Sequence, residues 1–163
     1  MMKSQAQKPY LDKKTALVKA ESWCAYQERS QQEVRDKLYE YGLHQKEVEE
    51  LVTELILTNF LNEERFAMAY VSGKVKIKKW GKIKIRQGLK LKKVPDKLIQ
   101  KALKSIDEEL YYNNLTALAL QKAKILTEKD PLKRKYKLAT FLMGKGFEQD
   151  LIFDVLKANN LSG

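Results

Sequence analysis

The chain has 163 residues, of which 44% are hydrophobic and 33% charged, a balance that fits a folded protein and excludes a disordered basic tail. Its net charge of +11 lies in residues 74–104, where thirteen Lys or Arg residues accompany one acid, so this basic tract carries +12 and the remaining residues −1. One cysteine and one histidine exclude an intramolecular disulfide and a zinc site of clustered ligands, and we expect no cofactor.

Residues 1–14 open the chain as a polar, basic segment without periodic apolar positions, and we expect a flexible arm there. The segment lacks the apolar run of an export signal. Nowhere do about 18 apolar residues follow one another, as a membrane helix requires. We therefore expect a cytoplasmic protein without a membrane partner.

From residue 15 onward the apolar positions repeat three times, with shifts of 51 and then 53 residues. The three series are Val34, Leu38, Leu43, Val48, Leu51, Val52; Ile85, Leu89, Val94, Ile99, Ala102, Leu103; and Leu138, Leu142, Phe147, Ile152, Val155, Leu156. Each series describes two amphipathic helices joined by a tight turn, and a further helix precedes each pair. The sequence therefore predicts an all-α fold of three tandem three-helix repeats, similar to helix-turn-helix units, in an elongated, curved array. The repeats are expected over residues 15–59, 60–106 and 107–160.

Residues with capping chemistry mark several of the predicted helix ends. Ser30, Asn62 and Asp130 each stand directly before a predicted helix, where a short polar side chain caps the free N–H groups. Gly42 and Gly146 stand just after a predicted helix, where a residue with positive φ is favoured. The two glycines therefore mark the turn between the second and third helices of the outer repeats.

Residues 74–94 carry two conflicting patterns. Apolar and basic residues alternate, which locally is typical of a β-hairpin that turns at Trp80 and Gly81. We favour a helix, because the register of the other two repeats places Ile85 and Leu89 on the buried stripe.

A helix in this position leaves Ile83, Gln87 and Leu91 on the face opposite to the core, beside basic side chains. Two interpretations of this apolar strip stay open: it packs against an adjacent repeat, or it docks a protein partner. Trp80 likewise either stacks on an unpaired base or packs against the helix below it.

The basic tract is the candidate binding surface, because solubility alone does not require positive charge to be concentrated in one segment. The ten basic residues that we assign to it are Lys74, Lys76, Lys78, Lys79, Lys82, Lys84, Arg86, Lys90, Lys92 and Lys93. A polyanionic partner is expected, and both phosphate and an acidic protein surface stay open as the counterpart.

Nothing in the sequence predicts catalysis or a metal site. No phosphate-binding loop of the G-x-x-x-x-G-K-[ST] kind occurs, so ATP hydrolysis by this chain is not expected. We expect Cys24 to be a buried core residue and His44 to be a solvated or capping residue before a helix. We therefore expect a protein that is not an enzyme.

The run from Phe60 to Val71 reads FLNEERFAMAYV and is similar to the signature of RecX regulatory proteins, in which acidic residues, an Arg-Phe-Ala triplet and an aromatic-Val pair open the second repeat. Other segments support the resemblance, namely Arg29-Ser30 with Glu33-Val34 and Lys37-Leu38, Gly81 with Ile85-Arg86 and Leu89, and Gly146-Phe147 with Ile152. The resemblance covers residues from about Thr15 to Asn159.

This resemblance implies a modulator of the RecA recombinase that lies along the groove of the RecA filament on single-stranded DNA. Such proteins usually inhibit the recombinase by blocking filament extension or promoting disassembly. We therefore expect the RecA filament and single-stranded DNA as partners, a role in recombination and DNA repair, and a monomeric chain. The alternative is an autonomous DNA- or RNA-binding protein of the helix-turn-helix kind, with residues 81–92 as its recognition helix.

Overall fold

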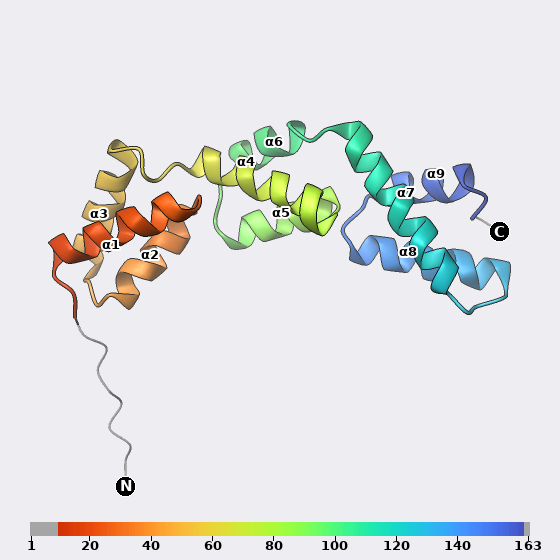
Figure 1. Cartoon of the computed structure of the whole chain (residues 1–163), viewed down its shortest axis with the longest axis horizontal. Coiled ribbons are helices and arrows are strands. Elements are labelled where there is room, and N and C mark those ends of the chain that lie inside the picture. Colours follow the sequence, from red (N-terminus) through yellow and green to blue (C-terminus); the bar gives the residue numbers. More distant parts are fainter. Residues whose placement is uncertain (1–9, 162–163) are drawn as a thin grey trace, which may run out of the picture. The chain divides into compact units, whose positions relative to one another are not determined.

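The computed structural model describes residues 10–161, which form nine α-helices and one π-helical turn without a strand (Figure 1). The elements are α1 (Lys13–Tyr26), α2 (Gln31–Glu40), α3 (Gln45–Leu57), α4 (Glu63–Gly73), the π-turn η1 (Lys74–Lys78), α5 (Lys82–Leu91), α6 (Asp96–Lys104), α7 (Glu108–Ile125), α8 (Pro131–Gly144) and α9 (Gln149–Ala158). The predicted all-α fold of three-helix repeats is confirmed. Of the arm expected over residues 1–14, residues 1–9 lie outside the described part, and α1 already begins at Lys13.

The predicted capping residues begin their helices as expected. Ser30, Asn62 and Asp130 each accept a hydrogen bond from the backbone N–H three residues later, at 3.0, 2.9 and 3.1 Å. Because these bonds satisfy donors that have no partner within the helix, they set where α2, α4 and α8 start.

The turns between second and third helices share one backbone conformation. Gly42 and Gly146 have φ of +92° and +95°, and Lys93 occupies the matching position of the middle repeat with φ of 58°. A residue with a Cβ atom adopts this left-handed conformation at a cost of about 1–2 kcal/mol, which Lys93 bears and the two glycines avoid.

The helical interpretation of residues 74–94 is confirmed, and the hairpin is not formed. Ile85 and Leu89 are fully buried on α5, as the repeat register predicted. The first part of the alternating pattern falls on η1, where Val75 is 3% and Ile77 78% exposed, and the second part falls on α5. In its first part, the wide π-turn thus gives the same alternation of buried and exposed residues as a strand.

The chain divides into two compact units. Of the described residues, unit 1 contains those up to Ala67 together with Lys92–Val94, and unit 2 contains Met68–Leu91 and those from Pro95 onward. In unit 1, α1, α2 and α3 enclose an apolar core that includes Cys24, which is 5% exposed. Burial raises the pKa of this thiol, so Cys24 is a core residue as predicted.

Arg65 holds the start of α4 within unit 1. Its guanidinium donates to a carboxylate oxygen of Glu28 at 2.9 Å and to the side chain and backbone carbonyl of Asn59 at 2.8 and 2.9 Å. Next to it Phe66 and Ala67 are 6% and 0% exposed. The Arg-Phe-Ala triplet therefore joins the chain between α3 and α4 to the loop after α1, and its role in this structure is to stabilise the fold.

In unit 2 the start of α5 lies against the turn between α8 and α9, backbone to backbone. The N–H of Gly81 donates to the carbonyl of Lys145 at 2.8 Å, and the N–H of Ile83 donates to the carbonyl of Gly146 at 3.0 Å. A Cβ atom added to Gly81 would lie 2.1 Å from the carbonyl carbon of Gly146. This contact, which joins the middle repeat to the third, is possible only without a side chain.

Replacing Gly81 by alanine tests this contact. We expect Gly81→Ala to lower the free energy of unfolding by about 1–3 kcal/mol, because the added methyl group forces the two backbones apart. Gly73→Ala is the matched control, since a Cβ atom there meets nothing within 4 Å. In the control, an end-of-helix glycine is replaced by a better helix former, which should stabilise by up to about 1 kcal/mol. Urea denaturation of both variants measures this, and equal stabilities would contradict the close contact.

Glu63, in the first turn of α4, provides a pH-dependent test of unit 1. Its Oε1 atom is buried and has no hydrogen-bond partner among the described residues, and burial raises the pKa of the carboxyl above its ordinary value of 4.5, with a smaller contribution from the charge of Glu33. A carboxyl whose pKa is higher in the folded state makes the protein lose stability as the pH rises from the ordinary to the raised value.

The variant Glu63→Gln removes this ionisable group and nearly preserves its volume. We therefore expect its melting temperature to exceed that of the unchanged protein above the raised pKa of Glu63. The difference should shrink as the pH falls towards 4.5 and the carboxyl becomes protonated in both states. Thermal unfolding across a pH series measures the difference, and a constant offset would contradict the role assigned to Glu63.

Candidate functional site

The ten candidate basic residues fall on three consecutive segments. Those in unit 2 are Lys74, Lys76, Lys78 and Lys79 on or just after η1, and Lys82, Lys84, Arg86 and Lys90 on α5. Lys92 and Lys93 follow α5 and belong to unit 1. The structure thus brings eight of the candidates into one unit, and their surroundings divide them further.

Two of the candidates are engaged in ion pairs that lie within the fold. The ammonium group of Lys82 lies 2.7 Å from a carboxylate oxygen of Glu108 and 4.8 Å from the centre of the Tyr111 ring. The ammonium group of Lys92 lies 3.2 Å from a carboxylate oxygen of Glu33. Both lysines therefore already have an acidic partner within their own unit, in partly exposed pairs that contribute at most about 1 kcal/mol each.

The ammonium groups of two further candidate lysines lie over the ring of Trp80. The ammonium groups of Lys74 and Lys84 each lie 4.4 Å from the ring centre, and the indole is half-buried. Each such cation–π contact is worth about 0.5–1 kcal/mol at an exposed site. This arrangement favours packing of Trp80 at the start of α5, and stacking of the ring on a base stays a prediction.

Five candidates have exposed side chains without a hydrogen bond, ion pair or ring contact to any of residues 10–161. They are Lys76, Lys78, Lys79, Arg86 and Lys93. Lys90 is almost as available, because the one ion pair that it forms within the described part of the chain is 4.0 Å long and joins it to the exposed Asp96. Exposed pairs of this kind contribute at most about 1 kcal/mol. These positive charges are the ones available to a partner.

The apolar strip on α5 is open to solvent. Ile83 is 46% and Leu91 83% exposed, and Gln87 is exposed between them. Exposure of two large aliphatic side chains on one short helix leaves apolar surface that a partner could cover. Docking of a protein on this strip stays a prediction.

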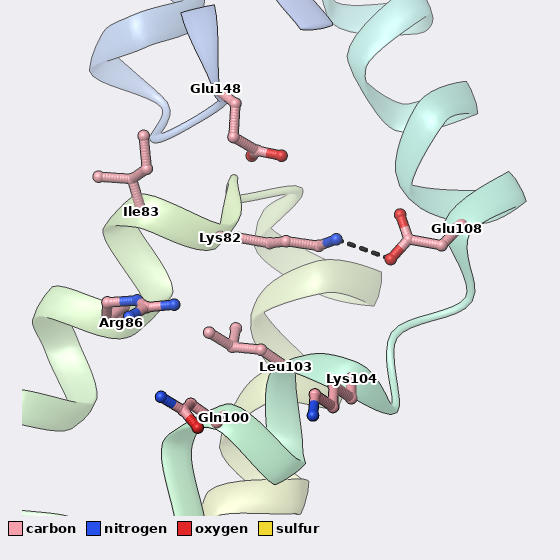
Figure 2. A pocket seen from close by; sticks show the side chains of 8 residues that line it. All are labelled: Lys82, Ile83, Arg86, Gln100, Leu103, Lys104, Glu108 and Glu148. Atoms are coloured by element: carbon pink, nitrogen blue, oxygen red, sulfur yellow. Dashed lines mark hydrogen bonds and ion pairs between the residues drawn. The ribbon is translucent and has the colours of Figure 1, made fainter. Parts of the chain in front are cut away.

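A pocket of about 410 Å³ opens beside Ile83 in unit 2 (Figure 2). Its lining residues come from α5, α6, the start of α7 and the N-cap of α9, and they are Lys82, Ile83, Arg86, Gln100, Leu103, Lys104, Glu108 and Glu148. Figure 2 shows Lys82 extending to Glu108 and Arg86 projecting from α5. The pocket therefore combines the aliphatic side chains of Ile83 and Leu103 with charges of both signs, among which the guanidinium of Arg86 has no partner in residues 10–161.

Tyr111 supports one wall of this pocket and was not predicted from the sequence. Its hydroxyl donates to the carboxylate of Glu148 and accepts a hydrogen bond of 2.9 Å from the backbone N–H of Lys82. The ring is 1% exposed, and burial, reinforced by the bond to Glu148, raises the pKa of the hydroxyl. The hydroxyl therefore stays a proton donor and joins α7 to α5 and α9. No local signal reveals this role, because its partners are 29 and 37 residues away.

No group of three or more His, Cys, Asp or Glu side chains in the described part of the chain is arranged to hold a metal ion. His44 is the N-cap of α3, in agreement with the capping role predicted for it. Among residues 10–161, no helix is both long and apolar enough to cross a membrane.

Three family models match the chain, one for each repeat. They describe the first, second and third three-helix domains of RecX and match residues 16–55, 62–103 and 108–156. A crystal structure of RecX from Lactobacillus salivarius is similar to this structure, with a TM-score of 0.82, 24% sequence identity, and coverage of 91% of this chain and 97% of that chain. That similarity concerns the fold.

Curated relatives with the name Regulatory protein RecX come from several bacteria. That of Clostridium acetobutylicum is 34% identical over 133 residues, which are 79% of this chain and 61% of the relative, and that of Bacillus mycoides is 31% identical over 137 residues, or 84% and 51%. The chain thus spans little more than half the length of these two. The protein of Prosthecochloris aestuarii is 31% identical over 145 residues, 89% of this chain and 93% of the relative.

These relatives are regulatory proteins by name, and no enzyme family is indicated, which agrees with the prediction of a protein that is not an enzyme. The three domain matches occur in the chain in the same order as the three predicted repeats. With the three domains in order and a relative matched over nearly its whole length, the chain belongs to the RecX family of regulatory proteins.

Proposed function

We propose that this chain binds the RecA recombinase filament on single-stranded DNA and inhibits it. The observation that carries the proposal is the surface of α5, where Ile83 and Leu91 are exposed next to the unpaired Arg86 in a member of a regulatory family. Such a surface combines apolar anchors with a charge for orientation, as protein docking sites do.

The chemistry of α5 suits an acidic and apolar segment of a protein partner. Arg86 presents a planar guanidinium that pairs with a carboxylate through two parallel hydrogen bonds. Ile83 and Leu91 gain about 25 cal/mol for each Å² of apolar surface that a partner removes from water. The positive charge of the tract accelerates the encounter with a negatively charged filament. A regulator bound in this way occupies the groove and competes with contacts between recombinase subunits.

The autonomous helix-turn-helix protein is the weaker alternative. In such proteins the N-terminal residues of the recognition helix contact base edges in the major groove. Here the N-terminus of α5 is hydrogen-bonded to the turn between α8 and α9, through Gly81 and Ile83. The end of the helix that should reach DNA is therefore occupied by the protein itself, which argues against this mode of binding.

The test adds the protein to preformed RecA filaments on single-stranded DNA and follows filament length and ATP hydrolysis. We expect both to fall, because the bound regulator competes with contacts between subunits. The double variant Ile83→Ser with Leu91→Ser should need at least tenfold more protein for the same effect, because burial of two aliphatic side chains contributes more than about 1.4 kcal/mol.

The control replaces two other exposed aliphatic residues, Leu57 (80%) and Ile125 (69%), by serine. The control should inhibit as strongly as the unchanged protein. Arg86→Glu should also weaken inhibition while it preserves the melting temperature, because Arg86 has no partner among the described residues. Filaments that are unaffected by the unchanged protein would refute the proposed function, and filaments that lengthen would reverse its direction.

A further inference from the structure

Residues 74–80, which we call the π-loop, hold a rigid shape between α4 and α5. The N–H of Trp80 donates to the carbonyl of Lys74 at 3.0 Å and closes the wide turn, and Lys79 ends it in a left-handed conformation with φ of 54°. Val75 is buried beneath the loop, and its carbonyl accepts a hydrogen bond of 2.9 Å from the buried side chain of Asn114. The π-loop is therefore anchored from inside, at Val75, and presents a defined outer surface.

That outer surface is an apolar side chain surrounded by positive charge. Ile77 is 78% exposed, and Lys76, Lys78 and Lys79 beside it are exposed without a side-chain partner in residues 10–161. No acidic residue occurs in the sequence between Glu64 and Asp96. An anchored turn that exposes an isoleucine among unpaired lysines is shaped for a partner with regularly spaced negative charges and flat apolar faces.

The preference for lysine over arginine indicates which kind of polyanion binds the π-loop. The basic tract contains twelve lysines and one arginine, and the three unpaired charges of the π-loop are all lysines. Protein–protein interfaces are enriched in arginine and depleted in lysine. Lysine acts as a flexible point charge, which suits phosphates that need no planar, two-pronged recognition. Single-stranded nucleic acid offers such phosphates together with uncovered base faces, which apolar side chains can contact or separate.

We propose that the π-loop binds single-stranded nucleic acid directly, with Lys76, Lys78 and Lys79 on the phosphates and Ile77 against the bases. The loop has no Asn, Gln, Arg, Asp or Glu to read base edges, and its exposed lysines are assigned to phosphates, so we expect little dependence of binding on the base sequence. This inference rests on the proposed function, since it concerns the same filament. It assigns contact with the DNA strand to the π-loop and contact with the recombinase protein to α5.

The first test measures binding to a single-stranded oligonucleotide by fluorescence anisotropy, without RecA, between about 50 and 200 mM salt. We expect the variant K76A/K78A/K79A to bind more weakly. The slope of log K against log salt should decrease by about two, since each phosphate contact on a single strand contributes about 0.7. The matched control is K14A/K19A/K46A, which removes the same charge from three exposed lysines of unit 1 and should preserve the slope.

The second test isolates Ile77 with an oligonucleotide that contains 2-aminopurine, whose fluorescence reports unstacking of bases. We expect Ile77→Ser to weaken binding about tenfold and to abolish the fluorescence change, because the apolar contact to the bases is lost. Its salt dependence should be unchanged, since no charge is removed. Ile125→Ser, at a site that is 69% exposed, should behave like the unchanged protein.

Several results would overturn the inference. The first is that the unchanged protein does not bind the oligonucleotide at the lowest salt, and the second is that both triple variants lose the same amount of affinity. The third is that π-loop variants bind the oligonucleotide normally yet fail to act on RecA filaments, a result that would assign the loop to a protein contact. The proposed function fails separately. If the unchanged protein binds DNA through the π-loop but leaves RecA filaments unaffected, the inference about the loop stands and the filament role is wrong.

Discussion

The contact between Gly81 and Gly146 is the constraint on which the candidate surface of unit 2 depends. Two backbone segments meet there without side chains, and two hydrogen bonds of 2.8 and 3.0 Å hold the start of α5 on the turn between α8 and α9. The buried hydroxyl of Tyr111 reinforces this junction by accepting from the backbone of Lys82 and donating to Glu148. Because one end of α5 is fixed, its outer face, with Ile83, has a defined position relative to the pocket lined by α6 and α7.

This junction also explains why a net charge of +12 in one segment does not act as a single patch. Lys82 is drawn to Glu108 once α7 lies beside α5, and Lys74 and Lys84 cover the ring of Trp80. Charges that are paired or placed on aromatic rings contribute to stability and are less available to a partner. The candidate charges without a partner in residues 10–161 lie on the π-loop, at Arg86 on the exposed face of α5, and at Lys93 after it. We therefore separate a proposed nucleic-acid contact from a proposed protein contact within one repeat.

The segment that carries the resemblance to the RecX family is largely structural in this chain. Arg65 binds Glu28 and Asn59, while Phe66 and Ala67 are buried. Residues of this kind are constrained by packing and by hydrogen bonds within the fold, so they identify the fold. The residues that we propose for binding, such as Ile77 and Arg86, are exposed and have no such constraint. The sequence therefore identifies the family more firmly than it identifies the residues that contact a partner.

Local chemistry in the sequence determined the helices and their ends. The spacing of Ile85 and Leu89 marked a buried helical face, Asp130 capped α8, and Gly146 ended it with a positive φ, because each of these effects acts within a few residues. The π-turn could not be predicted from such local patterns, since the alternation of Val75 and Ile77 in it matches that of a strand.

Only the tertiary structure decided which lysines are available, because Lys82 meets Glu108 across 26 residues and Tyr111 meets Glu148 across 37. Such pairs form when helices distant in the sequence dock, and docking depends on shape and close approach that no local pattern encodes.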